Sequence, residues 1–195
     1  MRSWRTQVRR ALLAQRQALE PAMLATLSGQ VRCNLTSRVE LKRYEVLGIY
    51  WPVRAEIDLR ALARAHLDAG GHVVMPAVTS KGTPVEFRSW HERVPMGRDA
   101  CNIPVPAERV LLEPDVLLVP LVGFDSQHYR LGYGGGYYDR TLAARALRPF
   151  CIGLGFEQAR LASILPQPHD IAMDLIITEA SAPNASQDRA GANPA

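Results

Sequence analysis

The segment from residue 46 to residue 78 constrains the fold more than any other part of the chain. It begins with an apolar run, VLGIYW (46–51), and ends with a second one, HVVMPAV (72–78). Between them, DLRALARAHLDAGG (58–71) reads as a helix that closes on paired glycines. A strand, a crossover helix and a second strand form a βαβ unit, and such units build parallel sheets. We therefore predict an α/β fold with a mostly parallel sheet flanked by helices.

Further segments extend this pattern toward the C-terminus. Strands are predicted at VEFRSW (85–90), DVLLVPL (115–121), FCIGLGF (150–156) and DLIIT (174–178), and helices from about Gly136 to Arg148 and over 157–164. The stretch 91–114 is rich in proline and glycine and is predicted to be a loop. A length of 195 residues suits one domain. We expect a single three-layer domain over 1–179 and a disordered tail over 180–195, which offers almost nothing to bury.

Residues 3–19 are predicted to form an amphipathic helix. Trp4, Val8 and Leu12 lie on an apolar stripe, and a neighbouring stripe carries arginines 2, 5, 9 and 16. An arginine-rich, acid-poor start is also typical of organelle transit peptides. A helix that docks on the body of the domain is the favoured interpretation, and its basic face taken alone predicts only a solvated surface.

The stretch RLGYGGGYYDR (130–140) places four glycines after the most hydrophobic strand. Ligands of open α/β sheets bind outside the carboxyl ends of the strands, and glycines let the backbone approach a ligand closely. The stretch matches neither a Walker A motif nor a dinucleotide fingerprint. By composition, a phosphate-binding loop and a structural glycine-rich turn are equally supported. Asp139 favours the loop, because a carboxylate beside phosphates implies a cation such as Mg²⁺, although it also suits a helix N-terminus.

Beyond these local features, the chain resembles the 5-formyltetrahydrofolate cyclo-ligase family over about residues 4–179. The segment LVPLVGFDSQHYRLGYGGGYYDR resembles the family's long signature, in which a strand leads to Gly-Phe-Asp, a turn and a glycine-rich loop. The segments RTQVR, NIPVP and PHDIAMDLIITE resemble its first helix, an internal segment and its closing strand. The resemblance implies the NagB/RpiA/CoA-transferase-like fold.

The resemblance also implies an enzyme that uses ATP and Mg²⁺ to convert 5-formyltetrahydrofolate into 5,10-methenyltetrahydrofolate. Phosphorylation of the formyl oxygen would create a leaving group, and N10 would close the ring with release of ADP and phosphate. Such a reaction needs positioning and charge neutralisation more than a protein nucleophile. The main alternative is a non-catalytic nucleotide- or folate-binding protein on the same scaffold.

Site residues follow from the same resemblance. Catalytic roles are implied for Arg130, Tyr137 and Asp139, and metal ligation for Asp139 and Asp174. The implied ATP-binding residues are Arg5, Arg9, Arg130, Leu131, Gly132, Tyr133, Gly134, Gly135, Gly136, Tyr137 and Tyr138. The implied substrate-binding residues are Trp51, Glu56, Tyr133, Gly134, Gly135, Gly136 and Tyr137. Read without the family, Asp174 is a residue at a strand end, Trp51 a core aromatic and Glu56 an acid near a helix start.

Composition narrows the partners and the compartment. The three cysteines are widely spaced, which fits reduced thiols in a cytoplasm rather than a zinc site or a disulfide framework. No apolar run is long enough to cross a membrane. The net charge is only +4, and beyond the first helix the arginines are interleaved with acids, so a nucleic-acid-binding module ranks last. We expect a monomer that binds small molecules, with no nucleic acid or membrane partner.

Overall fold

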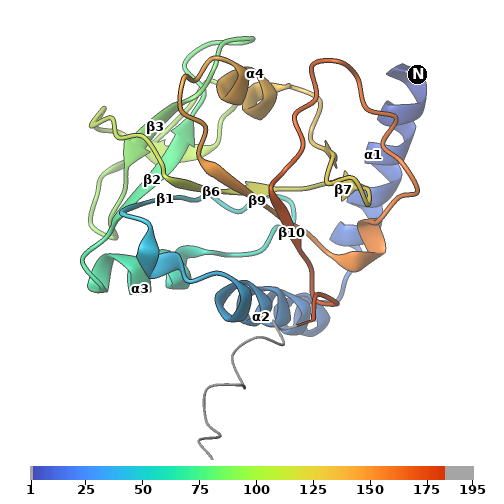
Figure 1. Ribbon diagram of the computed structural model, residues 1–195, viewed down its shortest axis with the longest axis horizontal. Helices are drawn as coiled ribbons and strands as arrows, with labels where there is room; N and C mark the ends of the chain where they lie inside the picture. Colours follow the sequence, from blue (N-terminus) through green and yellow to red (C-terminus); the bar gives the residue numbers. More distant parts are fainter. Residues whose placement is uncertain (1, 183–195) are drawn as a thin grey trace, which may run out of the picture.

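A six-stranded sheet forms the centre of the computed structural model, which describes residues 2–182 (Figure 1). Its strand order is β10-β9-β6-β1-β2-β3, and every neighbouring pair is parallel except β2 with β3. The strands are β1 (Val46–Gly48), β2 (His72–Ala77), β3 (Glu86–Ser89), β6 (Val116–Pro120), β9 (Phe150–Leu154) and β10 (Leu175–Ile177). The predicted βαβ unit is confirmed, because β1 and β2 pair in parallel.

Both faces of this sheet are buried. Along β6, Leu118 packs into one apolar cluster while Leu117 and Val119 pack into the other, and all three are fully buried. Successive side chains of a strand point to opposite faces, so a strand covered on both sides must be apolar throughout. This requirement explains the unbroken apolar run of the sequence, in which each fully buried leucine or valine contributes about 1.5–3 kcal/mol.

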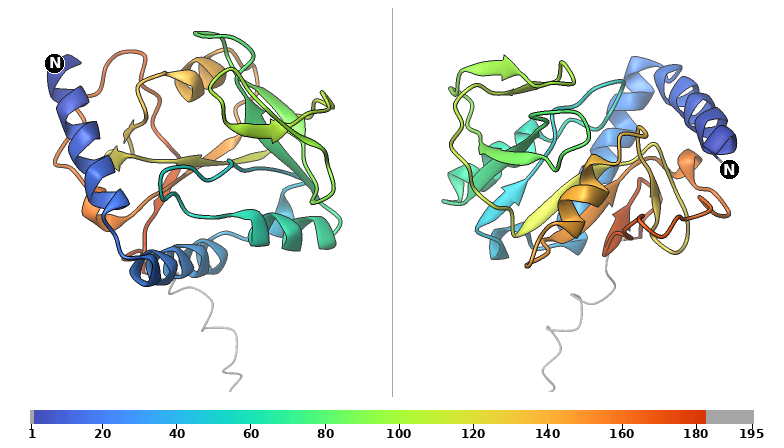
Figure 2. Two further views of the ribbon diagram at one scale, coloured as in Figure 1. Left: turned by 180° about the vertical axis from the view of Figure 1, so that it is seen from behind. Right: turned by 90° about the horizontal axis from the view of Figure 1, so that it is seen from above.

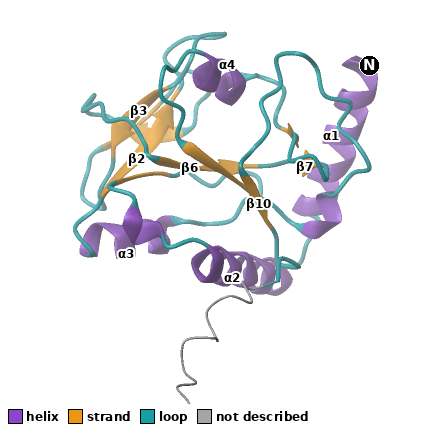
Figure 3. Ribbon diagram, in the orientation of Figure 1, coloured by secondary structure: helices purple, strands orange, loops and turns teal. Residues whose placement is uncertain are grey.

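Helices supply the two covering layers (Figures 1 and 3). The helices α2 (Pro21–Arg38) and α3 (Arg60–Asp68) lie on one side of the sheet, and α4 (Tyr137–Ala143) lies on the other. The helix α1 (Arg2–Gln17) stands at the side of the molecule beside β7 (Gly123–Phe124), as both views of Figure 2 show. Two single-turn 3₁₀ helices complete the order, Leu41–Arg43 and Glu157–Ala159. The predicted α/β fold with a mostly parallel sheet flanked by helices is therefore confirmed.

Several local predictions are corrected. The predicted loop over 91–114 contains an antiparallel pair, β4 (Met96–Arg98) with β5 (Pro104–Pro106). The carboxylate of Asp99 closes this hairpin by accepting the backbone N–H groups of Cys101 and Ile103, at 2.8 and 2.9 Å. A second small pair joins β7 to β8 (Arg130–Leu131).

Two predicted helices are shorter than expected. The helix α4 ends at Ala143 rather than near Arg148, because residues 143–148 add no buried apolar side chain and Leu147 is 89% exposed. Only a single 3₁₀ turn, Glu157–Ala159, forms in the predicted helix 157–164. Most of the predicted tail, residues 183–195, lies outside the described residues. Within residues 2–182, no helix has the length and apolar character that crossing a bilayer requires.

Candidate active site

A cavity of about 550 Å³ opens at the carboxyl ends of β1, β2 and β6. Its walls come from α1, the turn after β1, the loop before β5, the glycine stretch and the segment around Asp170. Every residue that the sequence assigned to ATP, substrate or catalysis lines this cavity. Of the predicted site residues, only Asp174 does not.

The glycine stretch adopts backbone conformations that other residues rarely tolerate. Gly134 has a φ of +94°, and Gly136, which precedes the first turn of α4, has a φ of +64°. A Cβ atom at Gly134 would lie 3.3 Å from the guanidinium carbon of Arg9. Glycine is needed at both positions because positive φ is strained for any residue with a Cβ. The loop therefore brings its backbone directly beneath an arginine of α1.

Two arginines of α1 reach the cavity but bind differently. Arg9 donates from Nε to the carbonyl of Gly132 at 2.8 Å. Within residues 2–182, no hydrogen bond occupies its two terminal nitrogens. Burial lowers the pKa of Arg9, and the nearby charge of Arg5 lowers it further. The carboxylate of Asp170, which pairs with Arg5, acts in the opposite direction, so burial is the main cause of the shift. An anion that paired with Arg9 would stabilise the charged form of this guanidinium.

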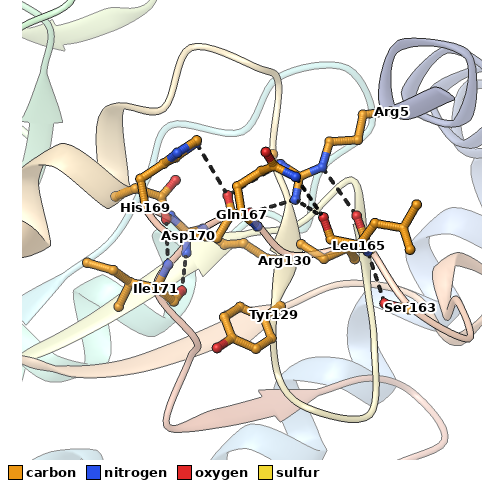
Figure 4. Close-up of polar contacts among 12 residues, drawn as sticks. Arg5, Tyr129, Arg130, Ser163, Leu165, Gln167, His169, Asp170 and Ile171 are labelled. Atoms are coloured by element: carbon orange, nitrogen blue, oxygen red, sulfur yellow. Dashed lines mark hydrogen bonds and ion pairs between the residues drawn. The ribbon is translucent and has the colours of Figure 1, made fainter. Parts of the chain in front are cut away.

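The guanidinium of Arg5, in contrast, forms hydrogen bonds with other residues of the protein (Figure 4). Its Nη2 contacts Oδ2 of Asp170 at 2.5 Å and the carbonyl of Leu165 at 2.9 Å. Its Nε also donates to the carbonyl of Ile164 at 3.2 Å. The side chains of Arg5 and Asp170 are only 12% and 9% exposed. Arg5 therefore fastens α1 to the segment before β10, whereas the resemblance implies that it binds ATP.

Arg130 and Asp139 form an ion pair in the cavity wall. Nη2 of Arg130 lies 3.0 Å from Oδ1 of Asp139, and the two side chains are 5% and 17% exposed. The same Oδ1 accepts the backbone N–H of Ile171 at 3.1 Å, and Nη1 of Arg130 donates to the carbonyl of Ile171 at 2.8 Å. The Arg130 guanidinium also lies 5.8 Å from the ring centre of Tyr138. The pair is thus held on two sides, while Oδ2 of Asp139 has no hydrogen-bond donor among residues 2–182.

A second polar cluster lies below the turn after β1. The carboxylate of Glu56, a residue 9% exposed, accepts the hydroxyl of Tyr133 at 2.5 Å and the backbone N–H of Val53 at 2.9 Å. The hydroxyl of Tyr133 in turn accepts Nη2 of Arg16 at 2.5 Å. Burial raises the pKa of Glu56, and the hydrogen bonds from Tyr133 and from the Val53 N–H lower it. Trp51 lines the cavity near this cluster, with the Arg60 guanidinium 5.0 Å from its ring centre.

Tyr50 brings a buried hydroxyl to the same region. The residue is 3% exposed and lines the cavity, yet its hydroxyl has no hydrogen-bond partner in the described structure. Burial raises the pKa of Tyr50, and the nearby charge of Glu56 adds to this effect. An unpaired buried hydroxyl loses its hydration without compensation.

Tyr50→Phe is therefore expected to increase the stability of the free protein. Removing the hydroxyl relieves the desolvation cost of an unpaired polar group, about 1–3 kcal/mol. Urea unfolding of the variant and of the wild-type protein would measure the difference. A matched Tyr44→Phe variant, at a half-exposed tyrosine stacked on Phe150, should change little. Destabilisation by Tyr50→Phe alone would mean that the hydroxyl has a structural partner.

Asp174 lies away from the cavity. Its Oδ2 accepts the backbone N–H of Cys151 at 2.7 Å and pairs with Arg148 at 3.0 Å. Asp174 immediately precedes β10, and Cys151 lies at the start of β9, so this carboxylate sits at the amino ends of parallel strands. The cavity opens at the opposite ends. Residues 2–182 contain no group of three or more His, Cys, Asp or Glu side chains that could hold a metal, so the predicted pair of metal carboxylates is not brought together.

Among the residues in or beside the site, the sequence patterns do not single out Arg16, Asp170 and Tyr50. Arg16 was placed on the basic stripe of the first helix, but its contacts lie in segments far along the chain. Asp170 lies in PHDIAMDLIITE, the segment that resembles the family's closing strand, and nothing in that pattern indicates a role for it. Tyr50 stood within a predicted buried strand, where an aromatic residue gives no sign of an unpaired hydroxyl.

Comparisons with known proteins all indicate the same family. Residues 1–179 match the family model described as the 5-formyltetrahydrofolate cyclo-ligase family. The chain is 30% identical over 184 residues to the 5-formyltetrahydrofolate cyclo-ligase of Mycolicibacterium smegmatis, covering 89% of this chain and 93% of that protein. It is 29% identical over 134 residues to the Escherichia coli protein of the same name, covering 65% and 73%.

Solved structures agree with the sequence comparisons. The NMR structure of a 5,10-methenyltetrahydrofolate synthetase from Aquifex aeolicus matches with a TM-score of 0.78 and 28% identity, covering 90% of each chain. A 5,10-methenyltetrahydrofolate synthetase from Mycoplasma pneumoniae matches with a TM-score of 0.75 and 26% identity, covering 90% of this chain and 98% of that one. The similarity therefore extends over the whole domain rather than over the glycine stretch alone.

Proposed function

Because this chain belongs to the 5-formyltetrahydrofolate cyclo-ligase family, we propose that it uses ATP to convert 5-formyltetrahydrofolate into 5,10-methenyltetrahydrofolate. One observation carries the proposal. A single cavity is lined on one side by Arg9 and the glycine stretch, which suit phosphates, and on the other by Trp51 and Glu56, which suit a pterin ring. The two substrates would therefore meet within the same enclosure.

The reaction begins at the formyl oxygen, which is a poor leaving group. This oxygen attacks the terminal phosphorus of ATP, an oxygen–phosphorus bond forms, and the bond from that phosphorus to ADP breaks. The formyl carbon is then electrophilic, N10 of the same molecule attacks it, and N10 loses its proton. Cleavage of the carbon–oxygen bond releases phosphate and leaves the N5,N10-methenyl bridge. The protein must position two ligands and neutralise charge, and needs no nucleophile of its own.

The described side chains suit these tasks. Arg9 presents its two terminal nitrogens above the glycine stretch, where backbone groups from Leu131 to Tyr138 would contact the phosphates. Arg130, fixed by Asp139 and by Ile171, would hold the terminal phosphoryl group in place. The ring of Trp51 would stack on the pterin, and Glu56 would accept hydrogen bonds from its N–H groups. Tyr137, half-buried at the cavity edge with its hydroxyl 3.5 Å from Cys101 Sγ, would close one side of the nucleotide.

The donors in the cavity fit a magnesium ion that arrives with the nucleotide. Mg²⁺ is usually held by one or two carboxylates together with phosphate oxygens. Asp139 offers Oδ2 toward that role, whereas Asp174 is engaged at the amino ends of the strands. When bound, the ion would neutralise charge that develops on the transferred phosphoryl group. We therefore propose Asp139 as its principal protein ligand.

Turnover with defined substrates tests the proposal. Formation of methenyltetrahydrofolate from 5-formyltetrahydrofolate would be followed by absorbance, with ATP, Mg²⁺ or the folate omitted in turn. We expect product only when all three are present, with one ADP released for each product. Calorimetric titration with each ligand distinguishes the alternative, because a binding protein would take up ATP or folate without forming product. Sedimentation would test the further expectation of a monomer, and cell fractionation that of a cytoplasmic location.

A further inference from the structure

Arg16 is a buried arginine beside the cavity whose three side-chain nitrogens all donate hydrogen bonds, and the proposed reaction gives it no role. It lies in the last turn of α1 and is 6% exposed. Its guanidinium donates from Nε to the carbonyl of Arg54 at 3.0 Å and from Nη1 to the carbonyl of Leu121 at 3.0 Å. Its Nη2 donates to the hydroxyl of Tyr133 at 2.5 Å. The three acceptors belong to three segments that are distant in sequence and that all border the cavity.

The first of these segments is a strained turn. Arg54 and Ala55 have φ values of +49° and +60°, and neither is glycine. Such conformations cost about 1–3 kcal/mol each and persist only where the surroundings enforce them. Inside the turn, the backbone N–H of Glu56 donates to the carbonyl of Val53 at 3.0 Å. Outside it, the bond from Arg16 to the Arg54 carbonyl holds the conformation that directs Glu56 toward the cavity.

The second segment carries Tyr133. Its hydroxyl accepts from Arg16 and donates to Glu56, so the phenol connects a buried cation to a buried carboxylate. Two guanidiniums lie near its ring, that of Arg16 at 5.9 Å and that of Arg54 at 5.4 Å from the ring centre. Two cations near one aromatic ring favour a fixed ring position. The third contact, to Leu121, ties the guanidinium to the chain just beyond β6.

We propose that Arg16 is a positioning residue for the reduced folate, which fixes the carboxylate of Glu56 and the phenol of Tyr133 where the pterin meets them. This inference rests on the proposed function for the identity of the ligand. Arg9 of the same helix lies over the glycine stretch, so α1 connects the nucleotide side of the cavity to the folate side. Arg16 contacts neither ligand in this arrangement and acts through Glu56 and Tyr133.

The charge of Arg16 also affects the titration of Glu56. The groups that face this carboxylate are Tyr133, the N–H of Val53, Arg16, Arg54, the buried phenol of Tyr50 and the half-buried Tyr138. Burial raises the pKa of Glu56, while the hydrogen bonds and the two arginine charges lower it. Removing Arg16 therefore raises this pKa further, and the ionised form is lost at a higher pH. The acid limb of kcat/KM for the folate should move to higher pH in the variant.

Arg16→Met tests the inference, with Arg10→Met at an exposed position of the same helix as its matched control. We expect the KM for 5-formyltetrahydrofolate to rise about tenfold or more, because a hydrogen bond to a charged group typically contributes that much to affinity. The KM for ATP should change far less. Calorimetric titration with 5-formyltetrahydrofolate alone should show the same loss of affinity. Urea unfolding would establish that the variant is folded under assay conditions.

Two further variants guard against a purely structural effect. Tyr133→Phe keeps the arginine but breaks the connection to Glu56, and should also shift the acid limb to higher pH. Arg16→Lys keeps the charge but cannot reach three acceptors, so it should restore the acid limb more than the folate KM. If folded Arg16→Met binds the folate as the wild type does, with an unshifted pH profile, the inference is wrong. The calorimetric titration with 5-formyltetrahydrofolate needs no turnover. An inactive wild-type protein would therefore contradict the proposed reaction, but the folate affinities of the wild type and of Arg16→Met could still be compared.

Discussion

Replacing Asp139 with asparagine is expected to lower kcat by about 100-fold or more, the loss typical when one charged group at a reacting centre is removed. Asparagine keeps the size of the side chain and an oxygen that can accept the N–H of Ile171. It removes the negative charge that balances Arg130, whose side chain is 5% exposed. It also removes the carboxylate oxygen that we assign to the magnesium ion. The variant should therefore bind both substrates and fail at phosphoryl transfer.

Two comparison variants make this prediction specific. Asp68→Asn, at an exposed position near the end of α3, is the control for a general effect of removing a carboxylate. Asp174→Asn should lose less activity than Asp139→Asn, because Asp174 bonds Cys151 and Arg148 rather than lining the cavity. Equal losses would indicate that both carboxylates act on one metal. Full activity of Asp139→Asn at saturating substrates would refute the catalytic role of this side chain.

The sheet could be predicted because its signal is local and strong. Each parallel strand is buried on both faces, so an unbroken apolar run such as 116–119 identifies it without knowledge of its neighbours. The β4 and β5 pair lacked that signal, since it contains prolines and its closure depends on the side chain of Asp99. The early end of α4 depends on the exposure of Leu147, which periodicity alone does not reveal.

The part of the cavity lining that comes from one continuous segment of the sequence could be predicted. The glycine stretch is continuous in sequence, and its position after β6 places it at the carboxyl ends of the strands. Contacts between distant segments were not predictable from the same patterns. The acceptors of Arg16 lie 38, 105 and 117 positions away along the chain, and nothing in a single helix indicates which carbonyls it will meet. The position of Asp174, in contrast, follows from the sequence pattern. A residue that immediately precedes a parallel strand lies at the amino end of that strand, away from the cavity.

Arg5 and Arg9 show why spacing alone could not separate two roles. They are four positions apart on one helix and therefore share a face. The difference arises from Asp170 and from the carbonyls of Ile164 and Leu165, which occupy the guanidinium of Arg5. Arg9 has one such partner, the carbonyl of Gly132. The structure thus distinguishes Arg5, which fastens the helix, from Arg9, whose two terminal nitrogens form no hydrogen bond within residues 2–182.

This division leads to a prediction for Arg9→Met, which is expected to raise the KM for ATP about tenfold or more. A hydrogen bond to a charged group contributes about 1.5–3 kcal/mol, and Arg9 has two terminal nitrogens that an ATP phosphate can engage. Burial is the main cause that lowers the pKa of Arg9; the charge of Arg5 adds to it and the charge of Asp170 opposes it. A polyanion that pairs with this guanidinium would stabilise its charged form. The KM for the folate should change little, because Glu56 and Trp51 lie on the other side of the cavity.

Arg5→Met gives the matched comparison, since it removes the same charge from the same face of α1. Its loss leaves the largely buried carboxylate of Asp170 without its cation, so urea unfolding should show a larger destabilisation than for Arg9→Met. Its effect on the KM for ATP should be smaller, because its donors are already bound to the protein. Initial rates at varied ATP and fixed folate would measure both variants. A larger rise in ATP KM for Arg5→Met than for Arg9→Met would reverse the two roles, and it would mean that Arg5 leaves Asp170 when the nucleotide binds.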